Sequence, residues 1–116
     1  MSRLRIPFAV MVAAAVAVSL GGHAAASAGS TTMRTVNVKD DAFSPKRAIV
    51  KRNTLVTFRW QGNRPHDVVS RGTRRFKSST IKTRGTHRVR FRTRGTYTYV
   101  CTLHAGRGMT GRITVR

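Results

Sequence analysis

The chain has 116 residues, of which 23 are Lys or Arg and only three are Asp or Glu, so its formal net charge is +20 at pH 7. This length suits one small domain after removal of an export segment and excludes two domains. The single cysteine excludes an intramolecular disulfide, the bond on which small exported domains often rely for stability.

The N-terminal segment is typical of an export signal. Basic residues precede an apolar stretch over 6–20, and small residues follow it. We predict a signal peptide over 1–28, cleaved near Ala26 or Ala28, and a flexible leader over 29–34. A retained anchor is the alternative, although the apolar stretch is shorter than the roughly 20 residues that a spanning helix needs. No cysteine lies in the segment 21–28 directly after the stretch, which excludes a bacterial lipid anchor. The expected location is the periplasm, the outer face of the cell envelope or the medium.

The predicted mature chain is strongly basic. Two of the 23 basic residues lie in the signal, so 21 remain against Asp40, Asp41 and Asp67, and residues 29–116 carry a formal charge of +18. Sixteen of the 21 are Arg, which binds carboxylate and phosphate in bidentate geometry. An acidic protein, an anionic membrane or envelope surface, and nucleic acid are the candidate partners. The alternative is that the charges only solvate the outer faces of strands.

Short runs of alternating apolar and polar residues fill 35–116, as half-buried strands require. In chain order, the predicted strands are 35–39, 48–50, 55–60, 66–69, 87–92, 97–101 and 111–115, with a turn around Phe43 and a weakly patterned stretch over 76–81. Seven or eight short strands separated by Gly and Pro indicate an all-β fold, an antiparallel Greek-key sandwich or barrel. Any helix is expected to be a short turn between Arg71 and Thr80.

Cys101 and three other residues of the chain offer donors that soft metals prefer. His104 and Met109 follow Cys101 in the same loop, and His66 begins an earlier strand. One thiolate, two imidazoles and a thioether favour copper. An unpaired thiol in an exported protein needs a reason, and a metal bond would protect it as a thiolate. The alternative is a buried, inert cysteine.

The spacing allows these donors to meet. Cys101 ends one predicted strand and Met109 precedes the next, with Gly106 and Gly108 between them. Glycine permits the backbone to fold back, so that Cys101, His104 and Met109 can face a common point. His66 could close the site from the side of the core.

The segment 35–116 resembles the small blue copper proteins of the plastocyanin and pseudoazurin type, the cupredoxin family. Its motifs are Phe43-Ser44-Pro45, Pro65-His66, Gly95-Thr96-Tyr97, Tyr99-Val100-Cys101 and Cys101-x2-His104-x4-Met109-x-Gly111. The last spacing resembles plastocyanin and differs from the longer azurin loop. The resemblance implies His66, Cys101 and His104 as strong trigonal copper ligands and Met109 as a long axial ligand. It also implies that the ring edge of His104 reaches the surface, where electrons are exchanged.

Four residues near these motifs need separate interpretation. The family often has Asn where this chain has Asp67, which can accept a hydrogen bond from Thr102 and, as an anion near the metal, would lower the reduction potential. The alternative for Asp67 is a surface carboxylate paired with an arginine. We expect His87 to be an ordinary strand residue and His23 to leave with the signal. Met33, in the leader, is at most an accessory copper contact.

The predicted function is that of an exported, monomeric one-electron carrier that docks to an acidic redox protein and is not an enzyme. Storage or delivery of copper in the envelope is the alternative, although proteins that hand over metal favour Met- or Cys-rich sites, and 29–116 contains only Met33 and Met109 as methionines. A basic nucleic-acid or envelope-binding module is a third candidate. Export and the scarcity of aromatic residues for base stacking disfavour nucleic acid. Catalysis by copper is disfavoured because additional His clusters and a second cysteine are missing from the sequence.

Overall fold

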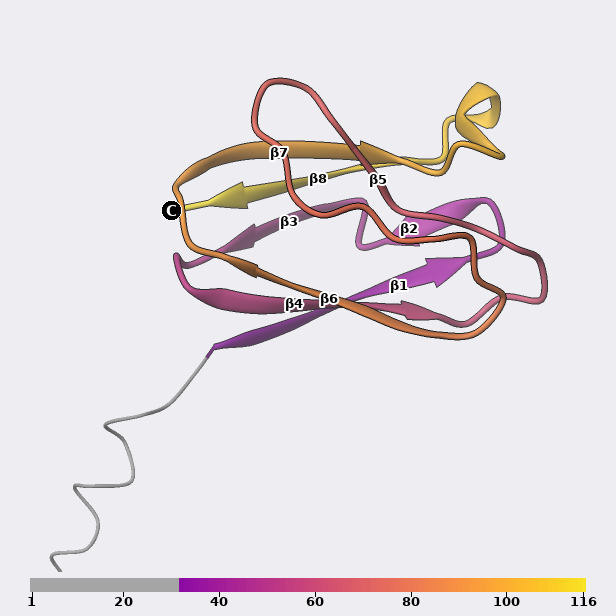
Figure 1. The fold of residues 1–116 in the computed structure, drawn as a ribbon, viewed down its shortest axis with the longest axis horizontal. Coiled ribbons are helices and arrows are strands. Elements are labelled where there is room, and N and C mark those ends of the chain that lie inside the picture. The colour runs from indigo at the N-terminus through magenta and orange to yellow at the C-terminus, as the bar shows by residue number, and fades with distance from the viewer. Residues whose placement is uncertain (1–31) are drawn as a thin grey trace, which may run out of the picture. The chain divides into compact units, whose positions relative to one another are not determined.

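The computed structural model describes residues 32–116, which form a sandwich of two four-stranded sheets (Figure 1). In chain order, the elements are β1 (Met33–Lys39), β2 (Ala42–Ser44), β3 (Arg47–Val50), β4 (Thr54–Trp60), β5 (Val69–Arg71), β6 (Gly85–Phe91), β7 (Gly95–Val100), the 3₁₀ turn η1 (Ala105–Arg107) and β8 (Thr110–Val115). The predicted all-β sandwich is confirmed. No helix of these residues is long and apolar enough to cross a membrane.

The strand order is β2-β1-β4-β6 in one sheet and β3-β8-β7-β5 in the other. Four of the six neighbouring pairs are antiparallel and two are parallel, and β1 with β2 is one of the antiparallel pairs. β4 pairs antiparallel with β6, and β7 pairs antiparallel with both β5 and β8. In contrast, β1 and β4 run parallel, as do β3 and β8. Each sheet therefore contains both kinds of pair. The two strands of each parallel pair are joined by a connection that crosses to the other sheet, as parallel strands cannot be joined by a tight hairpin.

The core lies between the sheets, as the alternating sequence requires. Every second residue of β4 from Val56 to Trp60 is buried, and so are Tyr97 and Tyr99 of β7. The ring of Tyr99 lies 4.8 Å from that of Phe43, across the sandwich from β7. These aromatic residues are packing residues of the core.

Tyr99 lies at the centre of this core, where its polar hydroxyl is unfavourable for stability. Its hydroxyl is buried and has no hydrogen-bond partner among the described residues, and burial raises the pKa of Tyr99 well above its ordinary value. The ring crosses over Gly111, the residue opposite it on β8, and a Cβ at Gly111 would overlap the ring. Gly111 is therefore required for close approach rather than for a turn.

Two sequence predictions of where strands begin were wrong in detail. Met33 and Arg34, assigned to the flexible leader, belong to β1 because they pair with Leu55 and Val56 of β4. The strand predicted at 66–69 begins only at Val69. Residues 29–31 of the predicted leader and the whole predicted signal lie outside the described residues.

The segment before β5 has a different backbone partner. His66 forms an isolated antiparallel bridge with Lys82, in which each backbone N–H donates to the other carbonyl at 2.9 Å. The N–H of Val68 donates to the Ser79 hydroxyl. The stretch 76–82 thus satisfies this backbone, and no helix forms between Arg71 and Thr80. The helical turn of the described residues, η1, lies instead in the loop between β7 and β8.

Three loops meet at one end of the sandwich. β1, β4 and β7 all run toward this end, where η1 lies (Figure 1). The chain leaves β1 through Asp40 and Asp41, and it leaves β4 through the loop 61–68. The predicted ligands and all three carboxylate side chains of the protein lie in these three loops.

Candidate metal centre

Three of the four predicted ligands converge at this end. The Nδ1 atoms of His66 and His104 lie 3.1 Å apart, and the Sγ atom of Cys101 lies 3.7 Å from the first and 3.5 Å from the second. His66 and Cys101 are fully buried, whereas the His104 side chain is 15% exposed. These atoms form a compact cluster that could hold a metal ion.

The spacing of the three atoms fits one ion. With metal–nitrogen bonds of about 2.0–2.1 Å and a metal–sulfur bond of about 2.3 Å, ligand atoms that subtend angles of about 100–120° at the ion lie about 3.1–3.8 Å from one another. The three measured separations fall within this range. A thiolate with two imidazoles is a soft donor set, and copper fits it.

The loop between β7 and β8 is closed by its own backbone. The N–H of Cys101 donates to the Met109 carbonyl at 3.0 Å, and the N–H of His104 donates to the Cys101 carbonyl at 3.2 Å. Gly108 ends η1 with a φ of 82°, in the left-handed region that favours glycine. The prediction that glycine lets the loop fold back is confirmed at Gly108.

Met109, the fourth predicted ligand, is fully buried. Its N–H donates to the His104 carbonyl at 3.3 Å, and its own carbonyl accepts from Cys101. The backbone of Met109 is therefore tied to two members of the cluster, directly before β8 begins at Thr110.

His66 is held from two sides. Its carbonyl accepts a hydrogen bond from the indole Nε1–H of Trp60, at 3.0 Å, as well as the bridge bond from Lys82. Its outer ring nitrogen, Nε2, lies 3.0 Å from Oδ1 of Asp40. Because an ionised carboxylate only accepts hydrogen bonds, Nε2 carries the proton and Nδ1 presents its lone pair to the cluster.

Asp40 is itself fixed by the loop after β4. Its carboxylate accepts the backbone N–H groups of Asn63 and Arg64, both at about 3.0 Å. The bond from Asn63, the bond from the His66 ring and the bond from Arg64 hold the pKa of Asp40 well below its usual range. A Cβ at Gly62 would overlap this carboxylate, so glycine is required there.

Asp67 braces the end of β7. Its two oxygens accept the backbone N–H of Thr102 at 2.7 Å and the Thr102 hydroxyl at 2.6 Å. The predicted bond to Thr102 is confirmed. Asp67 is 5% exposed, and its partner is the residue directly after Cys101. The alternative of a surface carboxylate paired with an arginine is therefore wrong.

Asp41 lies beside the outer edge of His104. Its Oδ1 is 3.6 Å from His104 Nε2, and its Oδ2 is 3.3 Å from Arg64 and 3.6 Å from Arg107. Neither Asp40 nor Asp41 was singled out as a site residue from the sequence, in which they are typical of a turn. The signal that could have found them is their rarity, because they are two of only three carboxylate side chains in the chain.

Two other candidate residues lie outside the cluster. His87 lies on β6, and its Nε2 is 2.7 Å from the Lys77 carbonyl, which confirms it as an ordinary strand residue. Met33 is 65% exposed at the start of β1. His23 lies outside the described residues.

The family model for the cupredoxin-like domain matches residues 9–115. The chain belongs to the cupredoxin-like family. A comparison with curated proteins gave no match.

Solved structures support the same fold. A purple cupredoxin from Nitrosopumilus maritimus is similar with a TM-score of 0.64 and 21% identity, covering 72% of this chain and 99% of that one. The oxidised plastocyanin of Dryopteris crassirhizoma gives 0.62 and 22%, covering 71% and 99%. A Sinorhizobium pseudoazurin gives 0.64 and 22%, covering 74% and 75%. The resemblance inferred from the sequence motifs is confirmed at the level of family and fold.

Proposed function

We propose that this cupredoxin is a one-electron carrier in which His66, Cys101 and His104 bind copper in a trigonal arrangement and Met109 is a weak axial ligand. The observation that carries the proposal is the convergence of one thiol and two imidazoles within 3.7 Å of one another. When bound, copper supplies a Cu(I)/Cu(II) couple. A site filled by four protein ligands offers no open position to a substrate, which supports a carrier over an enzyme.

Hydrogen bonds within the chain hold the proposed ligands in position without a metal. Asp40 keeps the proton of His66 on Nε2, so that Nδ1 is free to bind. The closed loop and the Asp67–Thr102 bonds restrict the Cys101 thiol. A site that is held in this way changes little between oxidation states, which favours fast electron transfer.

Electron exchange is proposed at His104. Of the three clustered ligands, it is the one whose side chain is partly exposed, at 15%. The neighbouring residues Ala105 and Gly106 have little or no side chain to obstruct a partner. A redox protein could therefore approach this ring edge closely.

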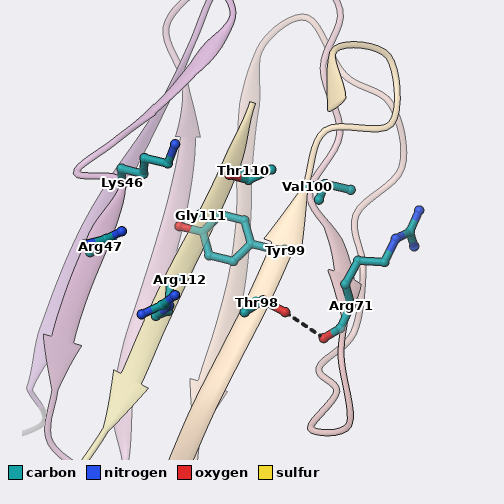
Figure 2. A pocket seen from close by; sticks show the side chains of 9 residues that line it. All are labelled: Lys46, Arg47, Arg71, Thr98, Tyr99, Val100, Thr110, Gly111 and Arg112. Carbon is teal, nitrogen blue, oxygen red and sulfur yellow. Dashed lines mark hydrogen bonds between the residues drawn. The ribbon is translucent and has the colours of Figure 1, made fainter. Parts of the chain in front are cut away.

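A basic groove of about 300 Å³ on the outer face of the β3-β8-β7-β5 sheet supports an acidic partner (Figure 2). Its lining includes Lys46, Arg47, Arg71 and Arg112. Arg47 and Arg112 lie opposite each other in register, an arrangement of like charges that is unfavourable unless an anion offsets it.

The groove begins beside the proposed copper loop. Val100 and Thr110 line it, and they directly adjoin Cys101 and Met109 in the chain. An acidic protein docked on this face would therefore lie next to the strand ends that carry two proposed ligands.

Copper loading tests the proposal. Protein reconstituted with Cu(II) is expected to show an intense visible charge-transfer band and the electron paramagnetic resonance signal of a copper–thiolate site, and both should vanish on reduction. Cys101→Ser should abolish the band, whereas the control His87→Gln should retain it. A colourless Cu(II) complex would contradict the proposal. Rapid transfer of copper to an apo-acceptor without electron exchange would instead support delivery or storage.

Export is a separate part of the proposal. It is supported by the basic, apolar and small-residue order of 1–28. N-terminal sequencing of the protein recovered from the envelope and the medium should give a chain that begins near residue 27 or 29. Recovery of the uncleaved chain in the cytoplasm would contradict export.

A further inference from the structure

The few negative charges of this protein are not spread over its surface. Its only three carboxylate side chains, Asp40, Asp41 and Asp67, all lie in loops of the metal centre. Against them stand 23 basic residues in the whole chain. The placement therefore concentrates the negative side-chain charges of the protein at the centre.

Each carboxylate contacts a different part of the centre. Asp40 contacts the His66 ring at 3.0 Å, and Asp67 binds the N–H and hydroxyl of Thr102, directly after Cys101. Asp41 lies 3.6 Å from the His104 ring. All three thus lie within one residue of a proposed strong ligand or in contact with it.

This placement acts on the two oxidation states unequally. With a Cys101 thiolate and neutral imidazoles, the centre carries one more positive charge as Cu(II) than as Cu(I). Nearby cations disfavour the more positive state and nearby anions stabilise it. The strongly basic domain therefore raises the reduction potential, and the carboxylates oppose that effect.

We propose that Asp40 and Asp67 are positioning residues whose negative charges stabilise the oxidised centre and lower its reduction potential against the field of the basic domain. This inference rests on the proposed copper function. Asp40 acts through the His66 ring, and Asp67 acts at the backbone that follows Cys101. Carboxylates that hydrogen-bond to the ligands of a metal also raise ligand basicity, which acts in the same direction.

Asp41 provides an internal comparison. Arg64 and Arg107 lie 3.3 and 3.6 Å from its carboxylate, so two cations already offset its charge. Asp40 and Asp67 make no such arginine contact among the side-chain ion pairs of residues 32–116. The three aspartates should therefore differ in their effect on the potential, although each substitution by Asn removes the same charge.

The test is a redox titration of the copper-loaded protein and of its Asp40→Asn, Asp67→Asn and Asp41→Asn variants, with visible spectra recorded throughout. We expect Asp40→Asn and Asp67→Asn each to change the ratio of Cu(II) to Cu(I) affinity about tenfold, which raises the potential of a one-electron couple by 59 mV. Asp41→Asn should raise it by less than half as much.

Arg92→Gln controls for the size of the effect of one charge far from the centre, although its change of net charge is opposite in sign, because Arg92 follows β6 at the end of the sandwich remote from the ligand loops. It should change the potential little. If Asp40→Asn and Asp67→Asn retain the visible band and their potentials rise no more than that of Asp41→Asn, the inference is overturned. Should Asp67→Asn fail to fold, Asp40→Asn decides alone. Absence of the band in the unsubstituted protein would overturn the proposed function instead.

Discussion

At the scale of the residue, the proposed ligands differ in how far the sequence predicts them. His66, Cys101 and His104 have donor types and a loop spacing that pointed to one site, and the structure brings them together. Asp40 could not be assigned in this way, because its contact with His66 spans 26 positions and depends on how the loop after β4 folds. Long-range pairs of this kind have no local sequence signal.

Met109→Leu tests the axial ligand. Leu is similar in volume to Met, so the fully buried site should tolerate the change at a cost below about 1.5 kcal/mol. Copper should remain bound through the other three ligands, and the potential should rise because the thioether no longer donates to Cu(II). Redox titration with copper analysis checks this. An unchanged potential would show that Met109 is a packing residue.

Gly62→Ala tests whether the position of the Asp40 carboxylate against His66 matters. The new Cβ would overlap the carboxylate and displace it from His66, so the thermal midpoint of the apo-protein should fall and the potential of the loaded protein should rise. Gly106→Ala is the matched control, because a Cβ there meets no atom within 4 Å. Equal behaviour of the two alanine variants in both measurements would contradict this account of Asp40.

At the scale of the element, the alternation of apolar and polar residues predicted most strands. It failed where the bounds of a strand depend on which other segment its backbone pairs with. β4, β7 and β8 have clear inward-facing residues and were predicted within two residues of their observed ends. The strand expected at 66–69 begins only at Val69 and runs to Arg71, because His66 pairs with Lys82 outside the regular ladders and β7 pairs with 69–71. The parallel pairing of β1 with β4 is likewise a property of the assembled sheet.

Tyr99 and Gly111 make a testable pair across β7 and β8. Gly111→Ala should destabilise the protein by about 1–3 kcal/mol through overpacking against the ring. Tyr99→Phe should stabilise it by about 1 kcal/mol, because it removes a buried hydroxyl that has no partner.

Denaturant titration of the two single variants and of the double variant measures their coupling. In the Tyr99→Phe background, Gly111→Ala should cost less, since the hydroxyl is one of the atoms that the new Cβ would overlap. Strictly additive effects would show that the hydroxyl plays no part in the crowding.

At the scale of the whole molecule, the negative and the positive side chains have different proposed roles, the first at the metal centre and the second in docking. The three carboxylates lie at the metal centre, where Arg64 and Arg107 contact Asp41, and the chain has 23 basic residues in all. The sequence predicted the acidic partner from net charge alone, but net charge cannot say which face docks. The in-register pair of Arg47 and Arg112 in the groove beside the copper loop is the observation behind the proposal that the β3-β8-β7-β5 face docks.

The double variant Arg47→Gln/Arg112→Gln should slow electron transfer to an acidic c-type cytochrome at low ionic strength and weaken its dependence on salt, because cations that steer the encounter are lost. Arg88→Gln/Arg90→Gln is the matched control, since it removes two exposed charges from β6, in the other sheet. Stopped-flow rates over a range of ionic strength compare the two proteins at equal net charge. If both variants slow the reaction equally, the general field of the protein steers the partner and the groove does not. A larger effect of the groove variant, with an unchanged visible spectrum, would place docking on the β3-β8-β7-β5 sheet.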